Sequence, residues 1–123
     1  MLAVWNEDDQ WHPAAIEAFS HLEGGRTAII TWDGVLWECA NAAVRTGFRN
    51  DVLALRTQLV VAGKLIEPTP LEADEAWRQY ARFGAAGAGM IDLISMELMR
   101  REKCDAVFSN DRHFHAAGVE TLF

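Results

Sequence analysis

The feature that most constrains the fold is the alternation of helix-like and strand-like apolar stretches along the whole chain. Helical apolar spacing predicts helices over residues 13–22, 33–46, 50–62, 70–82 and 90–102. Short apolar runs between them predict strands at residues 27–31, 65–66, 105–109 and 119–122. Strands separated by helices favour an α/β domain with a mainly parallel sheet covered by helices, in three α/β/α layers. In such a sheet the ligand site lies beyond the carboxyl ends of the strands.

Thr69-Pro70-Leu71-Glu72 is the clearest local signal in the sequence. Thr69 stands where a helix N-cap is expected, Pro70 suits the first helical position, and Glu72 occupies the capping-box position. The segment therefore predicts a helix that begins at Pro70.

Composition indicates one folded domain over residues 1–123. Half of the residues are hydrophobic and 24% are charged, which is ordinary for a globular protein. We find no membrane-length apolar run and no secretory leader, and Cys39 and Cys104 lack the spacing of a metal or disulfide framework. We therefore expect reduced thiols and a cytoplasmic location. The net charge of -7 argues against a broad nonspecific nucleic-acid surface, but it permits an acidic site that binds a metal.

Three acidic residues stand where the predicted topology places its ligand site. Glu38 lies little more than a turn into the helix that follows residues 27–31, Asp92 opens the helix over 90–102, and Asp111 follows the strand over 105–109. Clustered carboxylates repel one another unless a cation or a proton offsets their charge, and their oxygen atoms suit Mg²⁺ or Mn²⁺. The alternative is structural: Asp92 and Asp111 as helix caps or turn residues, and Glu38 as a solvated side chain.

Other polar groups have a structural reading that is at least as good as a functional one. His113 and His115 form an H-x-H pair, but no further ligand is arrayed with them, so surface or turn roles are favoured. The Gly-rich segment 84–89 lacks the residues of a phosphate-binding loop and is read as a connector. Asn41 and Asn110 suit either capping or orientation of a ligand. Several basic side chains suit either RNA phosphates or a solvated face, namely Arg78, Arg82, Arg100, Arg101 and Lys103.

Two long segments give the chain a family resemblance. ITWDGVLWECANAAVR pairs a strand with a helix that carries Glu38 and Asn41, and MIDLISMELMRREKCDAVFSNDRHF joins an acid that opens a helix to a strand that ends in Asp111. Together with NEDDQWHPAA, these segments resemble PIN domains, specifically the small bacterial toxin ribonucleases of the VapC type. The resemblance covers nearly the whole chain.

The resemblance implies a divalent-metal-dependent endoribonuclease of the PIN-like α/β/α fold. Glu38, Asp92 and Asp111 would bind Mg²⁺ or Mn²⁺, and water activated by the metal would cleave the RNA phosphodiester. The implied partners are the RNA substrate, a small antitoxin protein that covers the site and a second copy of the chain, and no membrane is implied.

The chain departs from the family pattern at its N-terminus. The family begins with a strand that ends in an acid, which an alignment through LAVWNEDD would place just upstream of Met1. Glu7, Asp8 and Asp9 do not match that acid. We therefore expect a domain that is incomplete at its N-terminus, and the competing hypothesis is a non-catalytic PIN-like module that binds a protein or RNA.

Overall fold

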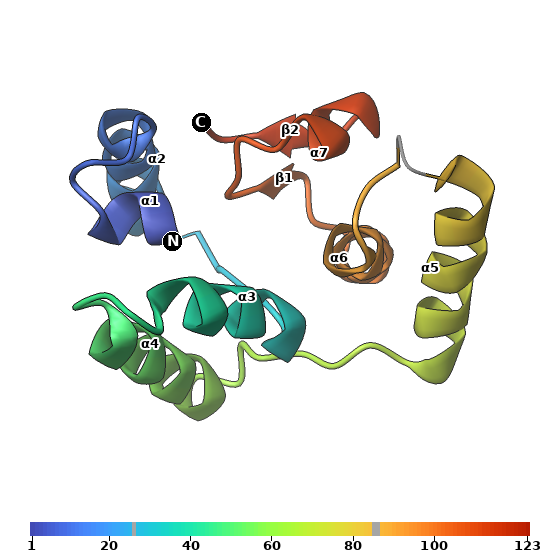
Figure 1. The fold of residues 1–123 in the computed structure, drawn as a ribbon, viewed down its shortest axis with the longest axis horizontal. Coiled ribbons are helices and arrows are strands. Elements are labelled where there is room, and N and C mark those ends of the chain that lie inside the picture. The colour runs from blue at the N-terminus through green and yellow to red at the C-terminus, as the bar shows by residue number, and fades with distance from the viewer. Residues whose placement is uncertain (26, 85–86) are drawn as a thin grey trace. The chain divides into compact units, whose positions relative to one another are not determined.

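The computed structural model describes residues 1–25, 27–84 and 87–123, which form two compact units (Figure 1). The first unit comprises residues 1–66 together with Phe123, and the second comprises residues 67–122. The first contains α1 (Leu2–Trp5), α2 (His12–Gly24), α3 (Asp33–Ala43) and α4 (Arg49–Val61). The second contains α5 (Pro70–Phe83), α6 (Met90–Glu102), β1 (Ala106–Val107), α7 (Arg112–Ala116) and β2 (Glu120–Thr121).

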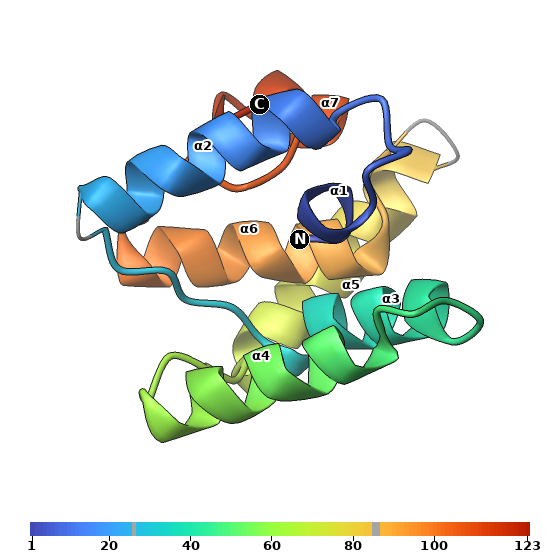
Figure 2. The same ribbon diagram turned by 90° about the vertical axis from the view of Figure 1, so that its left-hand side faces the viewer.

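The first unit contains two packed pairs of helices, α1 with α2 and α3 with α4. α3 contacts both α1 and α4, and Figure 2 shows α3 and α4 side by side. Cys39 and Ala43 of α3 and Val52 of α4 form a buried cluster. The N-cap of α3 is Trp32, and Asp33 is the first helical residue, where the predicted helix also begins. The Asp33 carboxylate accepts a hydrogen bond from Nε of Arg56 at 3.1 Å.

The predicted strand over residues 27–31 is reduced to one parallel bridge between Thr31 and Leu65. The backbone N–H of Thr31 donates to Lys64 O at 3.0 Å, and the N–H of Ile66 donates to Thr31 O at 2.8 Å. Residues 27–29 are exposed, and the structure assigns no strand to residues 27–30. β-branched residues favour a strand only where a neighbouring strand supplies ladder hydrogen bonds, and here the described residues supply them only at Thr31.

The capping box predicted from Thr69 to Glu72 is confirmed. The Thr69 hydroxyl accepts from the backbone N–H of Glu72 at 3.3 Å, and the Thr69 backbone N–H donates to Oε2 of Glu72 at 2.7 Å. These two bonds satisfy donors that the first turn of α5 would otherwise leave unpaired. Arg101 of α6 binds the same carboxylate at 2.8 Å and the Glu67 carbonyl at 3.2 Å. The C-terminal half of α6 is thereby joined to the start of α5.

α6 is the central element of the second unit and contacts both α5 and α7. Leu93 and Leu98 of α6 and Phe114 of α7 are buried. The buried carboxylate of Glu97 accepts from Nε2 of Gln79 at 2.7 Å and is paired with Arg100, so its charge is compensated.

A short parallel ladder follows α6 and pairs Ala106 with Glu120 and Val107 with Thr121. The predicted strand over 105–109 therefore shortens to two residues, and the predicted last strand is present as β2. The parallel pairing matches the α/β class that the sequence predicted. α7 lies between β1 and β2 in the chain and contacts both β2 and α6.

Three further sequence predictions concern the cysteines, membrane-spanning segments and the Gly-rich connector. Cys39 and Cys104 are both free thiols, as predicted. In the described part of the chain no helix is long and apolar enough to cross a membrane. The Gly-rich connector predicted over residues 84–89 includes positions 85 and 86, which lie outside the described residues.

Candidate metal centre

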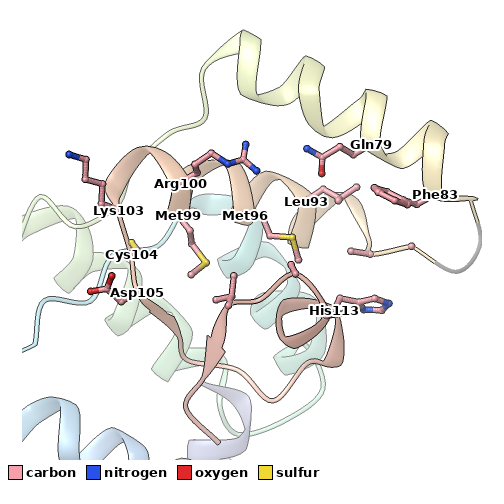
Figure 3. Close-up of a pocket in the computed structure, with 15 residues that line it drawn as sticks. Gln79, Phe83, Leu93, Met96, Met99, Arg100, Lys103, Cys104, Asp105 and His113 are labelled. Atoms are coloured by element: carbon pink, nitrogen blue, oxygen red, sulfur yellow. The ribbon is translucent and has the colours of Figure 1, made fainter.

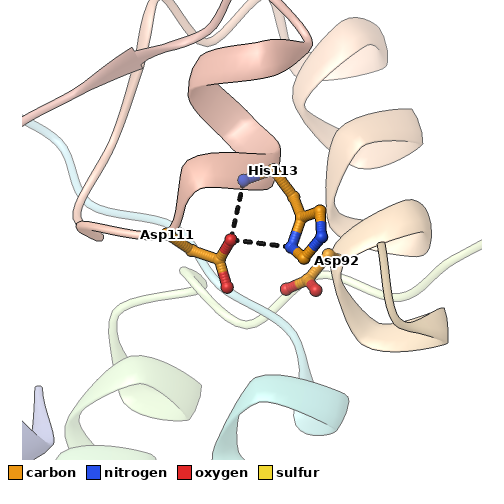
Figure 4. Close-up of side chains that lie close together, drawn as sticks. All are labelled: Asp92, Asp111 and His113. Atoms are coloured by element: carbon orange, nitrogen blue, oxygen red, sulfur yellow. Dashed lines mark hydrogen bonds and ion pairs between the residues drawn. The ribbon is translucent and has the colours of Figure 1, made fainter. Parts of the chain in front are cut away.

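Asp111 is positioned by the turn between β1 and α7. It is the N-cap of α7, and its Oδ1 accepts a hydrogen bond from the backbone N–H of His113 at 2.7 Å. Its own backbone N–H donates to the hydroxyl of Ser109 at 3.1 Å, which holds the turn that leads out of β1. An aspartate N-cap is favourable because it satisfies a free N–H and faces the positive end of the helix dipole. These bonds fix the direction of the Asp111 carboxylate (Figure 4).

Asp92 is held in the same way at the start of α6. It is the third helical residue, and its Oδ2 accepts from the backbone N–H of Gly89 at 3.2 Å. The side chain is half-buried. Burial, and secondly the negative charge of Asp111, raise the pKa of Asp92, while the hydrogen bond from Gly89 and the nearby His113 act in the opposite direction. The two acids therefore interact electrostatically although they lie far apart in the sequence.

His113 completes a group of three possible metal ligands with Asp92 and Asp111. One ligand atom from each residue lies within 4.8 Å of the other two. The ring Nδ1 of His113 is 2.9 Å from Oδ1 of Asp111, and Figure 4 shows the Asp92 carboxylate beside the same ring. All three residues are partly exposed, so a solvated ion can reach them.

The structure brings together two of the three acids that the sequence singled out. Glu38 lies on α3 in the first unit, where its side chain is exposed, whereas Asp92 and Asp111 lie in the second unit. Convergence of Glu38 with the other two acids therefore stays a prediction. The structural alternative is also partly correct, because Asp92 and Asp111 both cap helices.

His113 is the member of the group that the sequence analysis did not assign to the site. The H-x-H pair suggested a surface role for both histidines, and His115 is indeed exposed, whereas His113 is half-buried against Asp111. A usable signal was present. An aspartate N-cap bonds the backbone of the residue two positions later, so the side chain of that residue starts beside the carboxylate.

Comparison with protein-family models decides the family. The model of the PIN domain matches residues 2–120, and this match spans both compact units. The chain belongs to the PIN domain family. Comparisons with curated proteins and with solved structures gave no match. PIN domains are typically metal-dependent nucleases, so an acidic group such as Asp92 with Asp111 is the expected kind of site.

The donor set of this PIN domain fits a hard divalent cation. Capping uses Oδ2 of Asp92 and Oδ1 of Asp111 as acceptors. Each carboxylate oxygen has two lone pairs, so both carboxylates can still bind an ion. A divalent ion would also offset the repulsion that raises the pKa of Asp92. Carboxylate oxygens are the ligands that Mg²⁺ and Mn²⁺ prefer.

A cavity of about 590 Å³ in the second unit of this PIN domain extends along α6 from the metal-ligand group (Figure 3). His113 lines the cavity, and Phe83 and Met96 give it apolar walls. Arg100 and Lys103 line its other part, towards the C-terminus of α6, together with the acid Asp105. His113 thus belongs both to the acidic group and to the lining of an adjacent cavity that carries charges of both signs. We name this cavity the α6 groove.

Proposed function

We propose that this chain is a divalent-metal-dependent endoribonuclease that cleaves RNA phosphodiesters, with Asp92, Asp111 and Glu38 as ligands for Mg²⁺ or Mn²⁺. The observation that carries the proposal is the meeting of Asp92 and Asp111, each held by a backbone hydrogen bond, with the pKa of Asp92 raised by burial and by the charge of Asp111. A perturbed acid in such a group is typical of a functional site. Membership of the PIN family supports the same chemistry.

Each protein group has a separate task in this proposal. Asp92 and Asp111 bind the ion through their carboxylate oxygens, and their helix caps keep the carboxylates in place before the ion arrives. Glu38 adds a third carboxylate. When bound, the divalent ion polarises the scissile phosphate and lowers the pKa of water.

The α6 groove supports RNA as the substrate. Arg100 lies eight residues after Asp92 on α6, which places it about 12 Å further along the helix axis. Arg100 is paired with the buried Glu97, but its own side chain is largely exposed, so it can also contact the phosphates of neighbouring nucleotides. The exposed ring of Phe83 suits stacking on a base. Single-stranded RNA offers both groups at once, because its bases are unpaired.

We further propose a toxin role of the VapC type, with a homodimer and a small inhibitory protein as partners. The sequence segments around Glu38, Asp92 and Asp111 support this role. An inhibitor with basic side chains would complement the acidic group and the net charge of -7.

A cleavage assay tests the proposed function. The full chain is incubated with fluorescently labelled single-stranded RNA in MnCl₂, in MgCl₂ and in EDTA. We expect cleavage with either metal, none in EDTA, and a loss of about 10²-fold or more in the variants Asp92→Asn and Asp111→Asn, because each removes charge from the reacting centre. Asp51→Asn is the matched control, since Asp51 is an exposed acid in the first turn of α4.

Two results would contradict the proposal. Cleavage that persists in EDTA would exclude metal dependence. RNA binding without cleavage by the wild type would instead support the non-catalytic binding module.

A further inference from the structure

The position of His113 suggests a role that is separate from those of the acids. It lies in the first turn of α7, two residues after Asp111, and its Nδ1 is 2.9 Å from Oδ1 of Asp111. Its side chain is 27% exposed, so water has limited access to the ring. His115, two residues later on the same helix, is exposed and does not belong to the group. The two histidines of the H-x-H pair therefore have different environments.

The distance between His113 and Asp111 matches the spacing of two ligands on one ion. Atoms that bind an octahedral ion at about 2.1 Å lie roughly 3.0 Å apart when they occupy adjacent positions. Nδ1 of His113 and Oδ1 of Asp111 are 2.9 Å apart, and a ligand atom of Asp92 lies within 4.8 Å of both residues' ligand atoms. An ion can therefore replace the hydrogen bond with little movement of either side chain.

We propose that His113 is a nitrogen ligand of the divalent ion and that it makes this site prefer Mn²⁺ to Mg²⁺. The inference rests on the metal site of the proposed function. Imidazole nitrogen is a softer donor than carboxylate oxygen and binds Mn²⁺ and later transition metals better than it binds Mg²⁺. A site with carboxylate ligands alone should bind Mn²⁺ and Mg²⁺ with a smaller difference in affinity. The competing role is indirect: His113 orients the Asp111 carboxylate through the hydrogen bond and does not touch the ion.

Electron spin echo spectroscopy of the full chain loaded with MnCl₂ separates these two roles without any activity assay. A nitrogen bound to Mn²⁺ modulates the echo, and the modulation changes when the histidines carry ¹⁵N. We expect the modulation in the wild type and in His115→Gln, and its loss in His113→Gln. Glutamine keeps a hydrogen-bond donor near Asp111 but removes the imidazole nitrogen.

Calorimetric titration with MnCl₂ and with MgCl₂ supplies the second readout. We expect His113→Gln to weaken Mn²⁺ binding by about tenfold or more and to change Mg²⁺ binding far less, and His115→Gln to match the wild type for both ions.

Three other outcomes would overturn the inference. If Mn²⁺ binds to the wild type without nitrogen modulation, His113 is no ligand, and this result stands even where His113→Gln fails to fold. If His113→Gln weakens both ions equally, the orienting role is correct. In both cases the carboxylate site of the proposed function survives. If the wild type binds neither ion, the inference and the proposed function fail together.

Discussion

Asp92 in the first turn of α6 and Asp111 at the N-cap of α7 lie close enough for the charge of Asp111 to raise the pKa of Asp92. Burial is the larger cause of that rise. Each carboxylate is also held by a backbone N–H at the start of its helix. The folded chain thus holds two carboxylates that repel each other, and the capping hydrogen bonds keep both in position. Such an arrangement is expected where function requires the charges.

Replacement of Asp92 by Asn tests whether the charge at this position opposes folding. Asn keeps an oxygen that accepts from Gly89 and removes the negative charge. Without metal at neutral pH, we expect the melting temperature of Asp92→Asn to be at or above that of the wild type. Mn²⁺ affinity should fall by at least about tenfold, because a ligand oxygen loses its charge. Asp74→Asn, at an exposed position on α5, is the control and should change neither quantity.

The difference in unfolding free energy between Asp92→Asn and the wild type should depend on pH in a defined direction. The pKa of Asp92 in the folded state is raised above its ordinary value of 3.8, so the folded state binds this proton more tightly than the unfolded state. Binding of this proton adds to the free energy of unfolding. The contribution is complete below pH 3.8 and is lost as the pH rises through the raised pKa of Asp92. The advantage of Asp92→Asn over the wild type should therefore be absent at low pH and grow across that window. Chemical unfolding of metal-free protein from pH 3.5 to 7 measures it, and an advantage that shrinks with rising pH would contradict the assignment.

Glu38→Gln tests the predicted convergence of all three acids. If Glu38 binds the same ion as Asp92 and Asp111, its replacement should weaken Mn²⁺ binding by at least about tenfold. The melting temperature of the metal-free protein should change little, because the side chain is exposed. Glu17→Gln is the control, at an exposed position on α2. Equal Mn²⁺ affinities of Glu38→Gln and the wild type, measured by titration calorimetry, would remove Glu38 from the site.

Thr69→Ala tests the capping box at the start of α5. The change removes the acceptor for the Glu72 backbone N–H, which should cost about 1 kcal/mol of unfolding free energy. In a domain of this size that loss lowers the melting temperature by about 2–8 °C. Thr57→Ala is the control, since the Thr57 hydroxyl only bonds the Leu53 carbonyl one turn earlier on an exposed face of α4. A differential scanning calorimetry trace for Thr69→Ala that overlays the wild type would show that the box contributes nothing.

Local signals in the sequence were sufficient for the five helices α2 to α6 and for part of the site, whereas the short helices α1 and α7 were not predicted. The capping box from Thr69 to Glu72 was predictable because all of its interactions lie within four residues. Asp92 and Asp111 were predictable because each follows a recognisable boundary, the start of α6 and the end of the strand that contains β1. Their proximity was predicted from strand ends at one edge of a sheet, but in the described residues no strand lies between α5 and α6. Direct packing of α6 against α7 accompanies the proximity instead.

Features that depend on distant partners were not predictable in the same way. The stretch over residues 27–31 has strand composition, but only Thr31 finds a ladder partner in the described residues. His113 is a different case, because its partner Asp111 is only two residues away and the signal was local: Asp111 caps α7, which places its carboxylate beside His113.

X-ray diffraction from crystals of the full chain soaked in MnCl₂ tests the central claim most directly, because anomalous scattering locates Mn²⁺ without reference to activity. We predict one strong anomalous peak about 2 Å from carboxylate oxygens of Asp92 and Asp111. Crystals of Asp111→Asn treated in the same way should lack it. A wild-type crystal with no peak between Asp92 and Asp111, or with Mn²⁺ bound only elsewhere, would contradict the account.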